Sequence, residues 1–201
     1  MNSFVVLAVC LGNVCRSPMI ERMLEMRFHE RLGLDAGSVT VSSAGVLAPV
    51  GRPMDPTAAR ELQRLGGEPG GHLSRQLSAP MVQSADLVLT VTREIRSRVL
   101  EEFPGALRRT FTVREFSAIA ASEELCARPA RSAADLVQRA ARCKSSVRIQ
   151  DYDVSDPIGQ SQDFHRHVAD VIDADCRVIA RAVTAACTSD AHGVRATHEL
   201  P

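Results

Sequence analysis

Short apolar runs and longer stretches of helical spacing alternate along the chain. Residues 4–10 (FVVLAVC) are apolar throughout, which is typical of a strand buried on both faces of a parallel sheet. Residues 38–43 (SVTVSS) alternate in polarity, and two more apolar runs follow at 85–91 (ADLVLTV) and 109–113 (RTFTV). This pattern predicts four strands.

Helix signals lie between the predicted strands. Ser17 is suited to an N-cap with Pro18 at the first helical position, and Asp55 and Pro56 repeat that arrangement. Charged residues at helical spacing follow the third apolar run. Strands that alternate with helices are joined by right-handed crossovers, so the sequence predicts an α/β fold with a parallel sheet and helices on both faces.

The later part of the chain departs from this alternation. Residues 114–150 read as two helices, roughly 114–125 and 132–143, and we interpret them as a solvated helical insertion or flap in preference to a lid over substrate. Residues 161–187 carry apolar positions on one helical face and predict a long closing helix. We expect a single domain over 1–187, followed by a disordered polar tail, 188–201.

Composition and charge exclude several classes of protein. The net charge is zero, with 24 basic and 24 acidic residues, so nucleic acid is not expected as a partner. The longest apolar stretch, residues 4–10, is far shorter than a membrane span. The spacing of the six cysteines fits neither a zinc motif nor a disulfide framework. Free thiols in a soluble, cytoplasmic protein are therefore expected.

The sequence CLGNVCRSP, at residues 10–18, joins the first strand to the first helix and predicts an anion site. Backbone amides at a helix N-terminus converge on bound anions, and Gly12 and Asn13 suit a loop that curls inward. We expect the phosphate-binding residues to be Leu11, Gly12, Asn13, Val14, Cys15, Arg16 and Ser17.

Cys10 ends the strand at the edge of this loop, where the helix dipole and Arg16 favour a thiolate. A thiolate is a nucleophile, and the planar fork of Arg16 matches two oxygens of a phosphoryl group. Ser17 is placed to donate a hydrogen bond to the Cys10 sulfur when that sulfur leaves. These residue types at this spacing indicate phosphoryl transfer through a phosphocysteine.

The same residues carry a family resemblance. The chain resembles the bacterial branch of the low-molecular-weight protein tyrosine phosphatases, in the loop CLGNVCRSP and in SSAG (42–45), VGRPMDPTA (50–58), HLSRQL (72–77) and ADLVLTVT (85–92). The resemblance covers most of the chain except residues 114–150 and the tail. It implies a hydrolase with a four-stranded, three-layer, flavodoxin-like fold.

The resemblance also implies a general acid late in the chain. Asp156, followed by Pro157, occupies the place of the family's Asp-Pro pair. Asp156 is then expected to protonate the leaving oxygen while Cys10 attacks phosphorus, and afterwards to activate the water that hydrolyses the phosphocysteine. This chemistry requires no metal and no cofactor.

Three further residues acquire roles through the resemblance. Ser43 and His72 are expected to form a hydrogen-bond network with Asn13 that supports the loop. Cys15 resembles the second thiol that captures oxidised Cys10 as a reversible disulfide.

Substrate preference depends on the residues around the loop. The expected substrate pocket is lined by Leu47, Ala48, Pro49 and Ile158, where tyrosine-specific relatives carry aromatic residues. Relatives that act on phosphoarginine have threonine where this chain has Val14. The aliphatic side chain of Val14 favours phosphotyrosine, which we place first, with phosphoarginine second.

Two alternatives belong to other classes. A phosphate-binding module without turnover is disfavoured because Cys10, Arg16 and Asp156 are all retained, and an arsenate reductase is disfavoured because no cysteine follows the third predicted strand over 91–105. The expected partner is a phosphorylated protein, for which a bacterial tyrosine kinase is one candidate. The sequence leaves the oligomeric state open.

Overall fold

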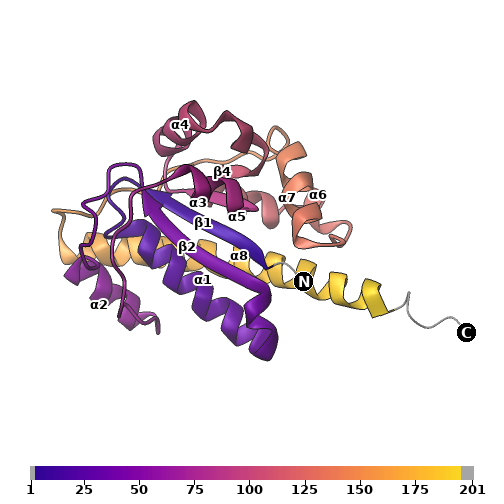
Figure 1. Cartoon of the computed structure of the whole chain (residues 1–201), viewed down its shortest axis with the longest axis horizontal. Coiled ribbons are helices and arrows are strands. Elements are labelled where there is room, and N and C mark those ends of the chain that lie inside the picture. The colour runs from indigo at the N-terminus through magenta and orange to yellow at the C-terminus, as the bar shows by residue number, and fades with distance from the viewer. Residues whose placement is uncertain (1–2, 196–201) are drawn as a thin grey trace, which may run out of the picture.

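A four-stranded, fully parallel sheet forms the centre of the molecule, as predicted. The computed structural model describes residues 3–195, without the side chains of residues 34–36 and 189–195. The strand order is β2-β1-β3-β4 (Figure 1). The strands are β1 (Phe4–Cys10), β2 (Val39–Gly45), β3 (Leu87–Thr90) and β4 (Thr110–Thr112).

Helices cover both faces of this sheet. The helices α1 and α8 pack against each other below the sheet in Figure 1, and α3 and α4 lie on the other side. That distribution is the one that right-handed crossovers produce for this strand order. The helices are α1 (Arg16–Leu32), η1 (Gly33–Ser38), α2 (Pro56–Arg64), α3 (Ala79–Ser84), α4 (Arg93–Glu102), η2 (Pro104–Arg109), α5 (Val113–Ala120), α6 (Glu123–Cys126), α7 (Ala133–Arg142) and α8 (Gln162–Arg195).

The central strand positions the loop that follows it. Residues Val6 to Val9 of β1 are completely buried, with helices on both faces, so the apolar run has no solvated side. The pairing register places Cys10 beside Gly45, the last residues of β1 and β2. The loops that leave these two strands therefore begin side by side at the carboxyl edge of the sheet, where open α/β sheets bind their ligands.

The start of α1 differs from the prediction. The helix begins at Arg16 with Cys15 at the N-cap position, so Ser17 lies inside the first turn. The Ser17 hydroxyl does not cap the helix because it donates to the Cys10 sulfur at 2.9 Å instead. The prediction of a helix start near Ser17 was thus confirmed, but the Ser17 hydroxyl bonds to Cys10 at the end of β1 and not to the helix backbone.

The closing helix is longer than expected. It continues through Arg195, whereas we predicted its end at residue 187 and a disordered tail from 188. Helical backbone hydrogen bonding persists despite the polar composition of residues 188–195; the rest of the predicted tail, 196–201, lies outside the described residues. Within residues 3–195, none of the helices has both the length and the apolar composition needed to cross a bilayer.

The segment predicted as an insertion forms three helices. The expected helix over 114–125 is divided into α5 and α6 by a turn at residues 121–122, and α7 corresponds to the expected helix over 132–143. After α7, Lys144 donates to the carbonyl of Thr110, the first residue of β4. This contact lies at the amino edge of the sheet, opposite Cys10.

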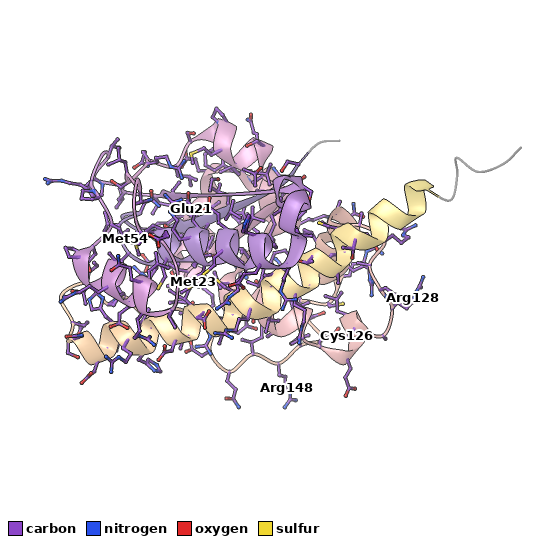
Figure 2. The ribbon with its side chains drawn as sticks, turned by 90° about the horizontal axis from the view of Figure 1, so that it is seen from below. Glu21, Met23, Met54, Cys126, Arg128 and Arg148 are labelled. Atoms are coloured by element: carbon purple, nitrogen blue, oxygen red, sulfur yellow. The ribbon has the colours of Figure 1, made fainter. Side chains whose placement is uncertain are left out.

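The helices α6 and α7 therefore do not form a lid over the loop at residues 10–17. They lie at the far end of the molecule from the carboxyl ends of the strands (Figure 1). Cys126 and Arg128 lie at that same end, well away from Glu21 and Met54 (Figure 2). Of our two interpretations, a lid formed by these helices is excluded.

Asp55 provides a test of the local helix signals. Its side chain accepts hydrogen bonds from the amides of Thr57 and Ala58, both at 2.9 Å, which confirms the predicted N-cap of α2. We expect Asp55→Ala to lower the free energy of unfolding by about 1 kcal/mol, because two helix amides lose their acceptor. Asp55→Asn should retain most of that stability, since its amide oxygen can cap as well. Chemical denaturation measures both, and equal losses would show that the charge matters and the cap does not.

Candidate active site

The loop from Leu11 to Cys15 turns its carbonyl groups outward. The carbonyls of Cys10 and Leu11 accept from the amides of Val46 and Leu47 at 3.1 and 2.9 Å. The carbonyl of Val14 accepts from the amide of Asp55 at 2.7 Å. Since successive carbonyls are held by neighbouring segments, the loop cannot rotate them toward its centre.

The amides of the loop are left for another acceptor. The amides of Gly12, Val14, Cys15 and Arg16 have no hydrogen-bond acceptor within the part of the chain that the structure describes. Buried amides rarely remain unpaired, and amides that precede a helix form anion sites. The loop is therefore built to hold an anion.

Cys10 lies at the base of this loop and is almost fully buried. Its sulfur accepts hydrogen bonds from the Asn13 amide at 3.1 Å and from the Ser17 hydroxyl at 2.9 Å. Two donors and no acceptor are directed at the sulfur, an arrangement that stabilises negative charge on it.

Asn13 holds the loop in its curled form. It has φ of 54° and is the one non-glycine residue within 3–195 with a positive φ. Asparagine tolerates this left-handed conformation better than other side chains, as its place in the loop predicted. The strain is compensated by hydrogen bonds at both its side chain and its backbone.

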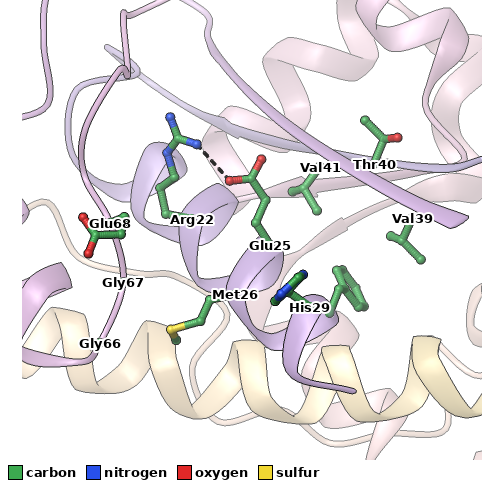
Figure 3. Close-up of a pocket in the computed structure, with 11 residues that line it drawn as sticks. Arg22, Glu25, Met26, His29, Val39, Thr40, Val41, Gly66, Gly67 and Glu68 are labelled. Atoms are coloured by element: carbon green, nitrogen blue, oxygen red, sulfur yellow. Dashed lines mark hydrogen bonds and ion pairs between the residues drawn. The ribbon is translucent and has the colours of Figure 1, made fainter. Parts of the chain in front are cut away.

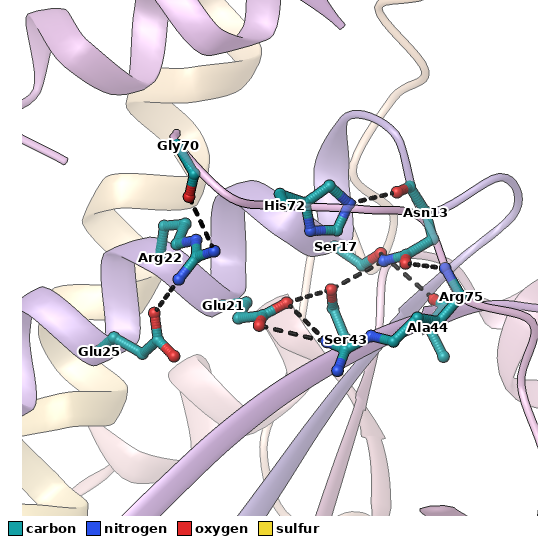
Figure 4. Close-up of polar contacts among 10 residues, drawn as sticks. All are labelled: Asn13, Ser17, Glu21, Arg22, Glu25, Ser43, Ala44, Gly70, His72 and Arg75. Carbon is teal, nitrogen blue, oxygen red and sulfur yellow. Dashed lines mark hydrogen bonds and ion pairs between the residues drawn. The ribbon is translucent and has the colours of Figure 1, made fainter. Parts of the chain in front are cut away.

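Those hydrogen bonds form a buried network (Figure 4). The Asn13 side-chain amide donates to the hydroxyls of Ser17 and Ser43 at 2.9 and 2.7 Å. The Asn13 side-chain oxygen accepts from the amide of Arg75 at 2.7 Å, and its backbone carbonyl lies 2.8 Å from Nε2 of His72. The structure thus brings together Asn13, Ser43 and His72, which sequence reasoning had grouped.

Two charged residues complete this network. Ser43 donates to the carboxylate of Glu21, which is itself buried, and Arg75 pairs with the same carboxylate at 3.2 Å. Sequence reasoning did not identify either residue. The spacing of Glu21 four residues after Ser17, on one face of α1, was the available signal.

Arg16 extends from the first turn of α1 across the loop toward the residues before α8. Its Nη1 donates to the carbonyl of Val154 at 3.1 Å, and its Nη2 pairs with Asp156 at 2.6 Å. The Arg16 side chain is 7% exposed and its Nε has no partner among the described residues. An unpaired buried donor beside unpaired amides reinforces the case for an anion at this place.

The segment that carries Asp156 is fixed at several points. The amide of Val154 donates to the carbonyl of Val91 at 2.8 Å, directly after β3. Arg93, at the start of α4, donates to Asp153 from its amide at 2.8 Å, and its guanidinium lies 5.2 Å from the ring of Tyr152. The Asp156 side chain itself remains 45% exposed, so it can turn between Arg16 and a ligand.

A further arginine fixes the beginning of the same segment. Arg114 of α5 pairs with Asp151 at 2.7 Å. Asp175 of α8 lies 3.9 Å from Arg114, and burial raises the pKa of its carboxyl. The acid-bearing segment is therefore tied to α4 and α5, which are distant from the loop in sequence, and Arg114 in turn pairs with α8.

Cys15 differs from Cys10 in its surroundings. Burial raises the pKa of the Cys15 thiol, and the nearby Asp55 carboxylate and Cys10 raise it further. Cys15 consequently remains a neutral thiol at physiological pH, and within the described residues hydrogen bonds are donated to the sulfur of Cys10 and not to that of Cys15.

The predicted pocket residues form an exposed rim around the loop. Leu47 is 65% and Ile158 47% exposed, and Pro49 is also exposed while Ala48 is half-buried. Pro49 lies next to Gly12, 3.7 Å from where a side chain at Gly12 would begin. The backbone amide of Ile158 donates a hydrogen bond to the carboxylate of Asp156 at 3.3 Å.

Gly45 is a second residue whose importance the sequence did not reveal. A Cβ atom at Gly45 would lie 2.6 Å from the Leu11 carbonyl oxygen and 2.9 Å from the Asn13 amide nitrogen. Only glycine lets the end of β2 approach the loop this closely. The motif SSAG was noted, but the close approach depends on strand register, which one sequence does not display.

A separate cleft of about 490 Å³ lies between α1, β2 and residues 66–68 (Figure 3). Arg22, Glu25, Met26 and His29 of α1 line it beside the edge strand β2. It contains none of the residues of the loop. In the described part of the chain, no group of three or more His, Cys, Asp or Glu residues is arranged to hold a metal ion.

Comparison with known proteins agrees with this geometry. Residues 5–131 match the family described as low molecular weight phosphotyrosine protein phosphatase. The match includes Cys10, Arg16, Ser43 and His72 and extends into the segment predicted as an insertion. Asp156 lies outside the matched stretch.

Curated relatives cover part of the chain. The chain is 40% identical over 106 residues to the low molecular weight protein-tyrosine-phosphatase Wzb of Salmonella typhi, across 47% of this chain and 66% of Wzb. It is 30% identical over 106 residues to Ptp of Acinetobacter johnsonii, across 53% of this chain and 69% of Ptp. The matches thus span about two thirds of these relatives.

A solved structure superposes on nearly the whole chain. The YwlE arginine phosphatase from Geobacillus stearothermophilus superposes with a TM-score of 0.67 at 25% identity, over 98% of this chain and 99% of that one. The flavodoxin-like, three-layer arrangement expected from the sequence is therefore confirmed, with a four-stranded sheet of this order.

Gly45 allows the loop geometry to be tested directly. We expect Gly45→Ala to weaken vanadate binding by about 10²-fold, because the added Cβ displaces the Leu11 carbonyl and the Asn13 amide. Gly105→Ala is the matched control, since nothing lies within 4 Å of a Cβ at Gly105. Isothermal calorimetry measures both affinities. Unchanged binding in Gly45→Ala would contradict the close approach.

Proposed function

The chain belongs to the low molecular weight phosphotyrosine protein phosphatase family, and on that premise we propose that it hydrolyses phosphorylated side chains of proteins through a phosphocysteine. The observation that carries this proposal is the Cys10 sulfur, which receives two hydrogen bonds beneath a ring of unpaired amides. A site that only bound phosphate would not require a thiol at that point.

In the first step, the Cys10 thiolate attacks phosphorus and the bond from phosphorus to the leaving oxygen breaks. The loop amides and Arg16 hold the equatorial oxygens of the phosphoryl group as negative charge shifts onto them. Asp156 gives its proton to the leaving oxygen, which otherwise departs poorly as an alkoxide or phenoxide. The substrate phosphate displaces the Asp156 carboxylate from Arg16, and the released, half-exposed carboxylate takes up a proton from solvent before it acts as the acid.

In the second step, water attacks the phosphocysteine and Asp156 accepts a proton from it. The phosphorus–sulfur bond breaks, and Cys10 leaves as a thiolate that the Ser17 hydroxyl and the Asn13 amide stabilise. Asp156 ends the cycle protonated, as it began. Apart from the attacking water, the groups that act in these two steps are side chains and amides of the chain.

Phosphotyrosine is the substrate that we propose first. Val14 has no hydroxyl to orient an attacking water, and the curated relatives are protein-tyrosine phosphatases by name. Phosphoarginine is the second candidate because the rim residues Leu47 and Ile158 are aliphatic and because an arginine phosphatase matches 98% of the chain. An aliphatic rim lacks the additional ~0.5–1.5 kcal/mol that aromatic pairing contributes.

We also propose that Cys15 protects Cys10 from irreversible oxidation. Peroxide would convert the Cys10 thiolate to a sulfenic acid, which condenses with the Cys15 thiol to a disulfide and releases water. Both cysteines are buried, and they lie at the two ends of the same short loop. A thiol reductant would then restore the enzyme.

The partner that we propose is a phosphorylated protein, with a bacterial tyrosine kinase as one candidate. Five cysteines of the described residues form no disulfide: Cys10, Cys15, Cys126, Cys143 and Cys176. Unpaired thiols persist in reducing compartments, which supports a cytoplasmic location.

The acid and nucleophile roles can be separated by pH. We expect kcat/KM on an aryl phosphate between pH 4.5 and 8 to follow a bell-shaped curve, which Asp156→Asn converts to a curve without its basic limb. The rate should fall by about 10²–10⁴-fold, the usual contribution of a general acid. Cys10→Ser should abolish turnover and retain vanadate binding.

The same assay includes phosphotyrosine and phosphoarginine peptides, whose ratio of kcat/KM decides between the two substrates. Retained turnover in Cys10→Ser would falsify the phosphocysteine mechanism. Absence of turnover on every substrate, with vanadate still bound, would favour the phosphate-binding module instead.

The attachment of the acid segment gives a second test. Asp153→Ala removes its contacts with Arg93, so we expect Asp156 to be less well placed and kcat/KM on phenyl phosphate to fall about tenfold. The loss on p-nitrophenyl phosphate should be smaller, because its leaving group needs less protonation.

Glu94→Ala is the control for Asp153→Ala. It removes another exposed carboxylate of the same region, which within the described residues pairs with Arg98 on the surface of α4. Equal losses on both leaving groups in Asp153→Ala would mean that the segment does not position the acid.

A further inference from the structure

Exposed apolar side chains gather at one end of the molecule. The described residues with large exposed apolar side chains are Leu11, Leu47, Val50, Leu73, Leu107 and Ile158. All except Leu107 belong to the phosphate loop, to the two segments beside it or to the acid segment. Apolar patches of this kind on a protein surface mark interaction sites.

Three of them form what we call the apolar ridge: Leu47, Val50 and Leu73. Their exposed fractions are 65%, 70% and 57%. Val50 and Leu73 extend beyond the residues expected to line the substrate pocket. A phenyl ring held in the phosphate loop has no need of apolar surface that far along the rim.

The ridge is held rigidly beside the loop. Ser74, which is 1% exposed, joins the two segments: its carbonyl accepts from the Gly51 amide at 2.9 Å, and its own amide donates to the Arg52 carbonyl at 2.8 Å. The amide of Leu47 binds the Leu11 carbonyl of the phosphate loop. A preorganised surface loses little conformational entropy when a partner binds.

The charged residues of the two segments that carry the apolar ridge are arginines. Residues 44–54 and 69–77 include Arg52, Arg75 and His72 and no carboxylate. Arg75 is paired with Glu21, whereas Arg52 is exposed and forms no ion pair within the described residues. Because Arg52 lies beside the apolar ridge, the surface favours a partner segment that has apolar side chains and a carboxylate close to them.

We propose that the apolar ridge binds the polypeptide that flanks the phosphorylated residue of the substrate, and that this flank is aliphatic with an acidic residue beyond it. The proposal rests on the proposed function, because the ridge is continuous with the phosphate loop through Leu47 and Leu11. A protein that places its phosphoryl group in the loop brings the neighbouring residues of its chain close to this surface.

The test compares peptides that differ only in the flank. Each phosphorylated residue, phosphotyrosine and phosphoarginine, is placed in one peptide with Leu and Val neighbours and in another with Ser neighbours, both followed by Glu. We expect kcat/KM to favour the aliphatic peptide by about tenfold, as burial of a few methylene groups provides.

The double variant Val50→Thr with Leu73→Gln should bring that ratio close to one. Leu107→Gln is the matched control, because Leu107 is 59% exposed on η2 at the opposite end of the sheet and should not change the ratio. Arg52→Gln should weaken binding of the peptides that end in Glu. It should not affect binding of matched peptides in which this Glu is replaced by Gln.

Turnover of an aryl phosphate separates this proposal from the proposed function. If the aryl phosphate is hydrolysed and the double variant keeps the wild-type peptide ratio, the ridge is not a substrate surface and the enzyme assignment stands. If sedimentation shows that the double variant converts a dimer to a monomer at unchanged peptide ratio, the ridge is covered by a second copy and the proposal is overturned. If nothing is hydrolysed, the peptides are titrated into Cys10→Ser, where equal affinities for both flanks would overturn it.

Discussion

Asn13 is the residue on which the geometry of the phosphate loop depends. Its left-handed backbone turns the adjacent carbonyls outward, and its amide reaches the Cys10 sulfur at 3.1 Å. A strained conformation of this kind persists only where the surroundings over-determine it. Here they do, because Ser17, Ser43, Arg75 and His72 all bond to Asn13. Preorganisation of the loop therefore depends on Ser43, Arg75 and His72, which lie outside the loop, as well as on Asn13 and Ser17.

The network around Asn13 connects the loop to the sheet and to α1. Buried Glu21 accepts from Ser43 and pairs with Arg75, so that a carboxylate buried near the site is compensated by a hydroxyl and a guanidinium. An uncompensated carboxylate at this depth would be costly. The negative charge of Glu21 also holds Arg75 in this network. Arg16 is the arginine of the loop, and its buried Nε has no partner among the described residues.

The acid and the nucleophile are brought together by tertiary structure. The segment that carries Asp156 is held by two helices, through the pair between Arg114 and Asp151 and the contacts of Arg93 with Asp153 and Tyr152. Asp156 pairs with Arg16 and its side chain is 45% exposed, so the proposed mechanism requires it to move from Arg16 to the substrate. The helices α6 and α7 stabilise the opposite end of the sheet and leave the approach to the loop open.

The sequence by itself determined the alternation of strands and helices and the position of the loop CLGNVCRSP, because buried strands, helix caps and that spacing are local patterns. Asp156 was identified through the family resemblance, and the catalytic roles of Cys10, Arg16 and Asp156 stay predictions. It was wrong about Ser17 as an N-cap and about the end of the last helix at residue 187. It also missed Gly45, Glu21 and Arg75. Their roles follow from the register of β1 with β2 and from side chains that meet across elements, and only the tertiary structure decides such contacts between residues distant in the chain.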